Sequence, residues 1–183
     1  MTDPCPLDPP SPFIEAWVMK LSRQIPESRR ALDVAMGRGR HASVLAAAGF
    51  RVFGVDDKLD VVIDAVASAS RLGLVVRGWC ADLTVFPLPS CRFDLIVITR
   101  YLQRDLCDAL ADALIPGGFL LYETFTEAQR SRGRGPTSAE HLLKPGELPA
   151  LFRGLAIVSY EELTDPDDDA LARLAARRRS SPS

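Results

Sequence analysis

The chain has 183 residues, of which 47% are hydrophobic and 25% are charged, a composition that suits one globular domain with a sizeable core. Its 22 basic and 24 acidic residues give a formal net charge of −2, which excludes a strongly basic nucleic-acid-binding protein. The apolar runs are too short to cross a bilayer, and the polar, proline-rich start lacks the pattern of a secretory signal. We therefore expect a cytoplasmic protein with neither a nucleic-acid nor a membrane partner.

The N-terminal region combines a proline-rich stretch with a helix. Residues 1–12 contain five prolines, which predicts an irregular arm. From Phe13 onward the apolar side chains recur at helical spacing. This helix either covers a ligand site or only packs on the rest of the fold, and the sequence leaves both interpretations open. We expect the domain to span residues 13–178 and residues 179–183 to form a flexible tail.

The segment from Ala31 to His41, Ala-Leu-Asp-Val-Ala-Met-Gly-Arg-Gly-Arg-His, predicts a strand, a glycine turn and the start of a helix. Its apolar run is typical of a buried parallel strand, and Gly37 and Gly39 permit a tight turn that a ligand can approach. A second apolar run, residues 52–55, ends at Asp56, where a carboxylate can accept hydrogen bonds from ribose hydroxyls. The pattern indicates a nucleotide site.

The details of the turn favour one class of nucleotide. A dinucleotide fingerprint requires a third glycine where this chain has Ala42, and it avoids an acid such as Asp33, which would repel pyrophosphate. Asp33 could instead attract an ammonium group or position a water. S-adenosylmethionine has both an adenosine and an amino-acid end and fits this pattern, with S-adenosylhomocysteine as the product.

The run from Asp33 to Gly39 resembles motif I of the class I S-adenosylmethionine-dependent methyltransferases, acid-x-Gly-x-Gly-x-Gly, with Ala35 at the first glycine position. The resemblance implies a three-layer, Rossmann-like α/β fold with a mainly parallel seven-stranded sheet and an antiparallel last strand. At Asp57 related sequences commonly have an apolar residue against the adenine, and Leu83 could supply that contact. The cofactor-binding residues that the resemblance implies are Asp33, Ala35, Met36, Gly37, Gly39, Arg40, Asp56, Asp57, Ala81, Asp82, Leu83 and Thr99.

The middle of the chain continues to alternate between helix and strand patterns. We expect a helix over 59–72, a strand over 74–79, a strand starting at Phe93 and a helix over 104–114. A turn at 116–118 then leads into a fifth strand. Such alternation with short connections implies a mainly parallel sheet covered by helices.

The C-terminal segment admits two interpretations. Residues 169–179 consist of helix formers, so propensity alone predicts a helix. The resemblance instead implies an antiparallel hairpin with strands over 155–162 and 171–176, and we favour the strand. Residues 146–152 and 160–162, Gly-Glu-Leu-Pro-Ala-Leu-Phe and Tyr-Glu-Glu, resemble those of the small TehB-like methyltransferases, which are named for a tellurite-resistance protein.

Candidate acceptor residues lie in and near residues 123–136, which follow the fifth strand at the edge where a cofactor is expected. Methyl transfer from a sulfonium needs donor and acceptor held in line, so it can proceed without a strong base. For a small thiol or metalloid oxyanion, positively charged side chains in a mobile loop would then matter most. The candidate catalytic residues are Tyr101, Glu123, Arg130, Arg134 and His141.

The sequence leaves two other functions open. One is a nicotinamide-dependent oxidoreductase, which would have to tolerate Asp33 and the missing glycine. The other is a regulatory protein that binds the nucleotide without catalysis. Four cysteines and two histidines show none of the spacings of a zinc site or a disulfide framework, so we expect reduced, buried thiols and no metal. The sequence leaves open the acceptor, the need for a general base and the oligomeric state.

Overall fold

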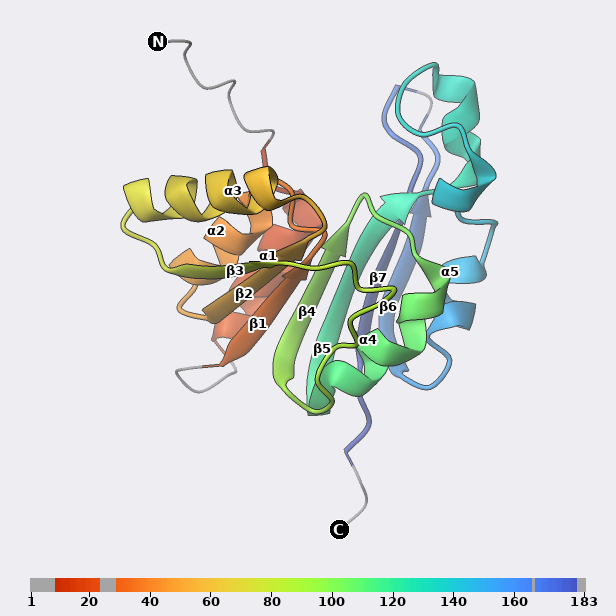
Figure 1. The fold of residues 1–183 in the computed structure, drawn as a ribbon. Helices are drawn as coiled ribbons and strands as arrows, with labels where there is room; N and C mark the ends of the chain where they lie inside the picture. The colour runs from red at the N-terminus through yellow and green to blue at the C-terminus, as the bar shows by residue number, and fades with distance from the viewer. Residues whose placement is uncertain (1–8, 24–28, 166, 181–183) are drawn as a thin grey trace, which may run out of the picture. The chain divides into compact units, whose positions relative to one another are not determined.

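Strands and helices alternate along the chain, as the sequence predicts (Figure 1). The computed structural model describes residues 9–23, 29–165 and 167–180. Its strands are β1 (Arg30–Val34), β2 (Arg51–Asp56), β3 (Val76–Cys80), β4 (Phe93–Thr99), β5 (Leu114–Phe125), β6 (Ala156–Leu163) and β7 (Leu171–Arg177). Its helices are α1 (Pro12–Ser22), α2 (Arg40–Ala47), α3 (Leu59–Arg71), α4 (Cys107–Ala113) and α5 (Glu147–Leu151), with short 3₁₀ helices η1 (Arg104–Leu106), η2 (Glu127–Arg132) and η3 (Ala139–His141). The seven described strands follow the order β3-β2-β1-β4-β5-β7-β6, and the sheet is mainly parallel.

The chain divides into two units, residues 1–81 and 82–183. In the first unit β1, β2 and β3 run parallel, with Asp33 opposite Gly54 and Gly54 opposite Gly78. The connecting helices α2 and α3 pack against these strands. The helix expected over 59–72 ends one residue earlier, at Arg71, and the expected third strand begins at Val76. The single domain expected over 13–178 stays a prediction.

Helix α1 begins one residue before the predicted start. Ser11 caps it, because its hydroxyl accepts a hydrogen bond from the Ile14 N–H at 3.5 Å, and Pro12 occupies a first-turn position that needs no N–H donor. The Ser11 N–H itself donates to Nε2 of the buried His41 at 3.0 Å. This hydrogen bond ties the start of α1 to the start of α2. Of the arm predicted for residues 1–12, residues 1–8 lie outside the described part of the chain.

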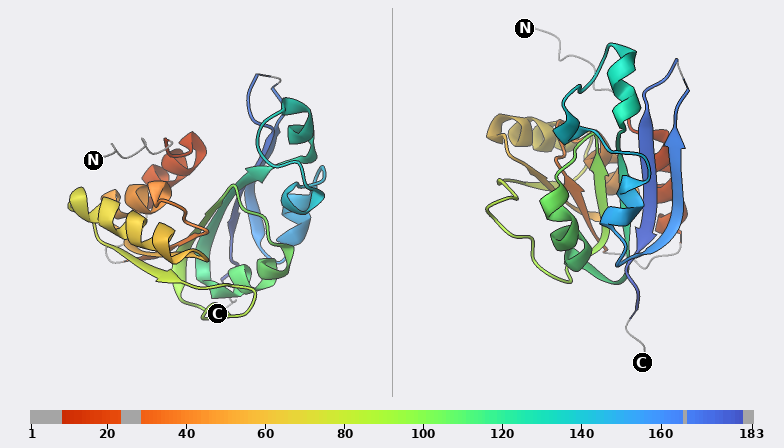
Figure 2. Two further views of the ribbon diagram at one scale, coloured as in Figure 1. Left: turned by 45° about the horizontal axis from the view of Figure 1, so that its top comes forward. Right: turned by 90° about the vertical axis from the view of Figure 1, so that its right-hand side faces the viewer.

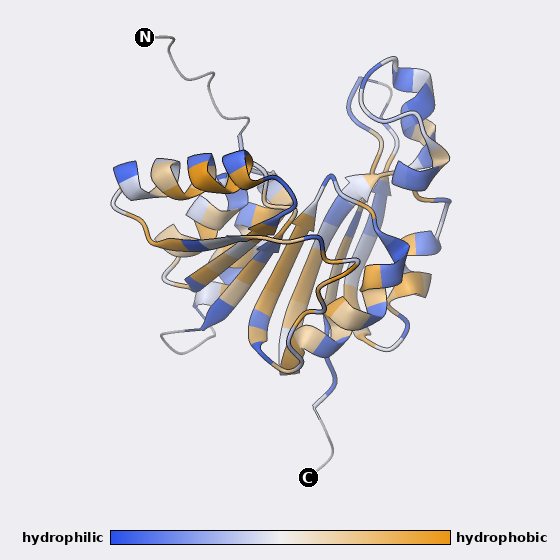
Figure 3. Cartoon of the chain, in the orientation of Figure 1, coloured by the Kyte–Doolittle hydropathy of each residue, from blue (hydrophilic) through white to orange (hydrophobic). Residues whose placement is uncertain are grey.

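The core of the second unit is built on β4 and β5. Leu95, Ile96, Val97 and Ile98 are fully buried, and this apolar run is orange in Figure 3. Two apolar faces of one strand can both be buried only when helices or loops cover each side, which is the arrangement of a parallel α/β sheet. The sequence pattern therefore identified this strand correctly.

Residues 116–118 lie inside β5 and form an irregularity there, where the sequence predicted a turn before the strand. Leu114 already pairs with Phe93, and the register then shifts before regular pairing resumes. Gly117, with φ of +82°, supplies the left-handed conformation that this irregularity needs. Because Leu114 belongs to the strand, the helix predicted over 104–114 is shorter, with η1 and α4 covering 104–113.

Strand β7 settles the alternative left open for the C-terminal segment. It pairs antiparallel with β5 on one side and with β6 on the other, and Figure 2 shows β6 and β7 side by side. Ala172, Leu174, Ala175 and Ala176 have no exposed surface. Ladder pairing on both edges and burial on both faces outweigh the small helix preference of alanine. The strand preferred from the resemblance is confirmed.

The residues after β7 are held by the end of α4. Arg178 Nη1 donates to the carbonyl oxygens of Asp112 at 2.7 Å and Leu114 at 2.5 Å. A guanidinium at a helix C-terminus satisfies carbonyl groups that have no partner within the helix. The predicted tail, 179–183, is described only as far as residue 180.

Candidate functional site

The glycine turn of the first unit has the left-handed backbone expected of a close ligand approach. Ala35, Gly37 and Gly39 have φ angles of 51°, 53° and 78°. The Met36 N–H donates to the Val55 carbonyl at 3.0 Å, and the Gly39 N–H donates to the Met36 carbonyl at 2.9 Å. Ala35 pays a steric cost at its angle that a glycine would avoid. Because strained backbone conformations cluster at binding and active sites, the left-handed angle of Ala35 indicates that this turn is functional.

Asp56 at the end of β2 fastens this turn. Its Oδ2 accepts from the Gly37 N–H at 2.9 Å, and its Oδ1 accepts from the Lys58 N–H at 3.2 Å. Each carboxylate oxygen can accept more than one hydrogen bond. Asp56 can therefore hold the turn in place and still accept hydrogen bonds from ribose hydroxyls.

Asp33 lies under the turn and is 1% exposed. Burial raises its pKa from 3.8 to about 7, an effect that the Ala42 N–H and the charge of Arg40 only partly offset. Among the described residues, no group makes a hydrogen bond to its Oδ2. A buried carboxyl oxygen without a partner is costly unless a ligand donor completes it. The residues of the turn thus fit a ligand that carries a donor group, such as an ammonium.

Small residues in the first unit make room for the turn. A Cβ at Gly39 would lie 3.0 Å from Ala65 Cβ, which explains why α2 can start so close to α3. A Cβ at Gly54 would lie 2.1 Å from Met36 Sδ. The Met36 side chain is 4% exposed and packs in a cluster with Val62 and Ala65. Met36, predicted to bind cofactor, therefore can offer a ligand only its main chain.

The other predicted cofactor residues lie in both units. In the first unit, Arg40 Nη1 donates to the Pro9 carbonyl at 3.2 Å. The Cys80 thiol donates to the backbone carbonyl of the exposed Asp57, at 3.4 Å from Sγ. The Ala81 N–H donates to the Asp56 carbonyl at 3.0 Å. These contacts organise the strand ends and leave the carboxylate of Asp57 exposed.

In the second unit Asp82 is exposed and accepts from the Thr84 hydroxyl at 2.6 Å and from the Thr84 N–H at 2.9 Å. These two hydrogen bonds lower the pKa of Asp82. Leu83 is partly exposed, whereas Thr99 is buried at the end of β4. Their role in binding a cofactor stays a prediction.

Glu123, a predicted catalytic residue, is engaged in an ion pair. It is 4% exposed, and its Oε2 accepts from Arg173 Nε at 2.6 Å. Arg173 also lies 3.4 Å from Glu161. Arg173 was not predicted from the sequence, because its partner is 50 residues away in the chain and only the antiparallel pairing of β5 with β7 brings the two together.

Arg134 is held in place, contrary to the mobile guanidinium that the sequence suggested. Its Nε donates to Asp169 Oδ1 at 2.8 Å, and its Nη2 donates to the Asp167 carbonyl at 3.0 Å. The buried Gln129 holds the same loop in place. Its Nε2 donates a hydrogen bond to Asp169, and its Oε1 accepts one from the Ala170 N–H at 2.7 Å. The charge of Arg134 is therefore already paired.

The remaining predicted residues have different surroundings. Arg130 is exposed on η2, and none of the residues that the structure describes forms an ion pair with it. His141 is exposed at the end of η3. Tyr101 is partly exposed and its carbonyl accepts from the Tyr122 hydroxyl at 2.9 Å. Catalytic roles for these residues stay predictions.

Arg104 is a second residue that was not predicted from the sequence. Its guanidinium binds both oxygens of Glu147, at 2.6 and 3.0 Å, and donates to the carbonyls of Glu140 at 2.9 Å and Leu142 at 3.0 Å. This bidentate pair lowers the pKa of Glu147. Arg104 thus fastens the segment that leads into α5.

Cys80 and Cys91 are exposed, whereas Cys107 is buried, so the expectation of buried thiols is wrong for the first two. Cys5 lies outside the described residues. No three His, Cys, Asp or Glu side chains in the described part of the chain are placed to hold a metal ion. Over the same residues, every helix is too short or too polar to span a membrane.

Residues 31–118 match the family model described as a methyltransferase domain. A protein-L-isoaspartate O-methyltransferase of Chlorobaculum parvum is 29% identical over 129 residues, which cover 67% of this chain and 59% of that protein. The chain thus spans about three fifths of the length of this curated relative.

Solved structures share the fold at low sequence identity. A SAM-dependent methyltransferase from Aquifex aeolicus has a TM-score of 0.69 and 20% identity, with 90% of this chain and 89% of that chain covered. TehB from Haemophilus influenzae has a TM-score of 0.70 and 17% identity, with 90% and 62% covered. These similarities confirm the Rossmann-like methyltransferase fold.

Proposed function

We propose that this chain is an S-adenosylmethionine-dependent methyltransferase that acts on a small-molecule acceptor by in-line transfer. The observation that carries the proposal is the buried carboxyl of Asp33, whose Oδ2 has no partner among the described residues, beneath a left-handed turn. An amino-acid ligand supplies the ammonium donor that this oxygen lacks. The match of residues 31–118 to a methyltransferase domain supports the same conclusion.

Different residues of the first unit would bind different parts of the cofactor. The turn at Gly37 and Gly39 lets a ligand approach the main chain, and Asp56 accepts hydrogen bonds from ribose hydroxyls while it fastens the turn. Asp33 accepts from the ammonium group. When bound, S-adenosylmethionine supplies an electrophilic methyl group, so the protein has mainly to orient the acceptor and exclude water.

The acceptor is proposed from the TehB-like resemblance of the C-terminal half, which favours a thiol or a metalloid oxyanion. Of the arginines singled out in the sequence, Arg134 is paired with Asp169, and Arg130 is exposed without an ion pair among the described residues. Arg130 is therefore the available guanidinium for an anionic acceptor. Tyr101, Glu123 and His141 remain candidates for contact with the acceptor, with Glu123 restrained by Arg173.

Two other functions receive less support. A nicotinamide-dependent oxidoreductase would have to place the pyrophosphate of its cofactor beside the carboxyl of Asp33. This chain also lacks the third glycine of a dinucleotide fingerprint and has Ala42 at that position. A regulatory protein without catalysis would bind the cofactor at the same turn. It differs from an enzyme only in the absence of turnover.

A thermal-shift and calorimetric comparison tests the cofactor. We expect S-adenosylhomocysteine to raise the melting temperature and a nicotinamide dinucleotide to leave it unchanged. Asp56→Asn should weaken the binding of S-adenosylhomocysteine by about tenfold, because one acceptor for ribose is lost. Asp64→Asn, which changes an exposed carboxylate of α3, is the matched control. Absence of binding to the wild-type chain at millimolar ligand would refute the proposal.

Transfer of a labelled methyl group to thiols, metalloid oxyanions and small organic acids then tests catalysis. Product in one of these classes supports an enzyme and names its acceptor. Cofactor binding without any product across the panel favours the regulatory alternative.

A further inference from the structure

A hollow of about 510 Å³ opens on the second unit, in a part of the chain that the proposed cofactor residues do not reach. Thr126, Glu127 and Arg130 line it from the start of η2, Pro145 lines it before α5, and Glu162 and Thr164 line it from the end of β6. Its volume lies in the range of pockets that hold small organic molecules. It is open to solvent, so a ligand can enter without a change of fold.

The hollow carries charges of both signs. Arg130 is exposed, and no ion pair or hydrogen bond joins its guanidinium to the residues that the structure describes. Glu127 is also exposed, and Glu162 is partly buried. The lining of the hollow therefore includes one arginine and two glutamates. Such a set complements a ligand that has both a negative and a positive group.

Glu162 is fixed in position by neighbours that keep one oxygen occupied. Its Oε1 accepts from the Gly146 N–H at 2.8 Å and from the Tyr160 hydroxyl. Burial and the hydrogen bond to Glu162 raise the pKa of Tyr160, so its hydroxyl stays protonated and remains a donor. Among the described contacts, none uses Oε2 of Glu162. This second oxygen is held at a defined place with its acceptor capacity unused.

We propose that this hollow binds a small zwitterion of the α-amino acid class, with its carboxylate on Arg130 and its ammonium on Glu162. A carboxylate alone would gain Arg130 but meet the repulsion of Glu127 and Glu162. An amine alone would leave the guanidinium of Arg130 without a partner. An additional basic group on the ligand would face Glu127, so a basic amino acid should bind more tightly than an acidic one.

This binding goes beyond methyl transfer. It uses Arg130, which is also proposed above for an anionic acceptor, but it requires neither the cofactor nor a transferred methyl group. The site lies wholly in residues 126–164, whereas the evidence for the cofactor comes chiefly from residues 33–56. Binding of S-adenosylhomocysteine to the same samples reports on the proposed function separately. Either result can therefore fail without the other.

Nuclear magnetic resonance titration of the full chain tests the proposal, with L-lysine, L-glutamate, butyrate and butylamine as probes. We expect L-lysine to shift the amide signals of residues 126–130, 146 and 162–164 and to bind at least about tenfold more tightly than butyrate or butylamine. L-glutamate should bind more weakly than L-lysine. Failure of L-lysine to shift these signals, or equal binding of butyrate, would overturn the proposal.

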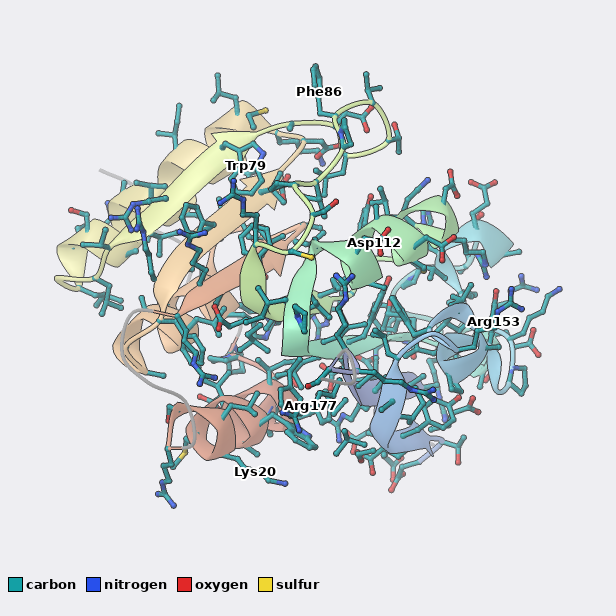
Figure 4. All side chains as sticks on the ribbon, turned by 90° about the horizontal axis from the view of Figure 1, so that it is seen from below. Lys20, Trp79, Phe86, Asp112, Arg153 and Arg177 are labelled. Carbon is teal, nitrogen blue, oxygen red and sulfur yellow. The ribbon has the colours of Figure 1, made fainter. Side chains whose placement is uncertain are left out.

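Three variants locate the charges. Arg130→Gln and Glu162→Gln should each weaken the binding of L-lysine by about tenfold. The glutamine at 162 keeps a carbonyl oxygen that can accept from the Gly146 N–H, so the fold is retained. Arg153→Gln is the matched control, because Arg153 is exposed outside the hollow and points outward in Figure 4. Unchanged affinity in Arg130→Gln, or an equal loss in Arg153→Gln, would contradict the assignment.

Discussion

Arg173 of β7 lies directly opposite Glu123 of β5, and its Nε is 2.6 Å from Glu123 Oε2. On its other side Arg173 lies opposite Glu161 of β6, at 3.4 Å. The Glu123 side chain is 5% exposed, whereas that of Glu161 is 51% exposed. One arginine thus bridges three neighbouring strands, but the two ion pairs differ greatly in their access to water.

Arg173→Met should destabilise the protein by about 3 kcal/mol, because it leaves the Glu123 carboxylate buried without its partner. Urea denaturation at neutral pH measures this loss as a lower midpoint. Glu161→Gln removes only the solvent-exposed pair and should cost less than about 1 kcal/mol. Equal losses in the two variants would show that burial does not set the strength of these pairs.

Local patterns predicted most elements of the fold, and where they erred the cause was tertiary pairing. The run 95–98 identified β4, because a strand buried on both faces is apolar throughout. Residues 171–177 consist largely of helix formers, and propensity alone would have assigned them wrongly. Pairing with β5 and β6 decides their structure, and only the resemblance to a known fold anticipated that pairing.

The carboxyl of Asp33 should make the stability of the protein depend on pH. Its pKa is about 7 in the folded chain and 3.8 in the unfolded reference, so the folded state binds more protons between these values. Stability from this group is fully present below about 3.8 and is lost as the pH rises through about 7. Wild type should therefore lose up to a few kcal/mol over this window relative to Asp33→Asn.

Chemical denaturation of wild type and Asp33→Asn at several pH values measures this difference. The binding of S-adenosylhomocysteine to wild type should also tighten as the pH rises through about 7, because the ammonium group favours the ionised carboxyl. Parallel stability profiles for the two proteins would argue against a raised pKa at Asp33.

The candidate site shows the same division between local and distant causes. The turn from Ala35 to Gly39 was predicted because its glycines and flanking strands are contiguous in sequence. The partner of Arg134 could not be predicted, because Asp169 follows 35 residues later and reaches it only through the β6–β7 hairpin. Residue type alone therefore could not distinguish the paired Arg134 from the exposed Arg130.

Gly54 should tolerate a methyl group poorly, because its Cβ would lie 2.1 Å from the buried Met36 Sδ. We expect Gly54→Ala to destabilise the protein by about 1 to 3 kcal/mol through overpacking. Adding Met36→Ala to Gly54→Ala should recover part of this loss, which a double-mutant cycle measures. Gly154→Ala is the control, since nothing lies within 4 Å of its Cβ, and it should be neutral or slightly stabilising. Strict additivity of the two changes would contradict a direct clash.

Arg104 should control the local stability of the segment before α5. Its guanidinium holds Glu147 and the carbonyls of Glu140 and Leu142, so Arg104→Gln removes several charge-assisted hydrogen bonds at once. We expect faster amide exchange and faster proteolysis over residues 139–147 in this variant, measured under native conditions by mass spectrometry. Because Arg104 lowers the pKa of Glu147, the wild-type protection should also decline when the pH falls through the folded pKa of Glu147. Arg153→Gln should leave exchange in this segment unchanged. A variant at Arg104 that exchanged like wild type would show that the apolar packing of Leu142 and Leu148, both buried, is sufficient to hold the segment.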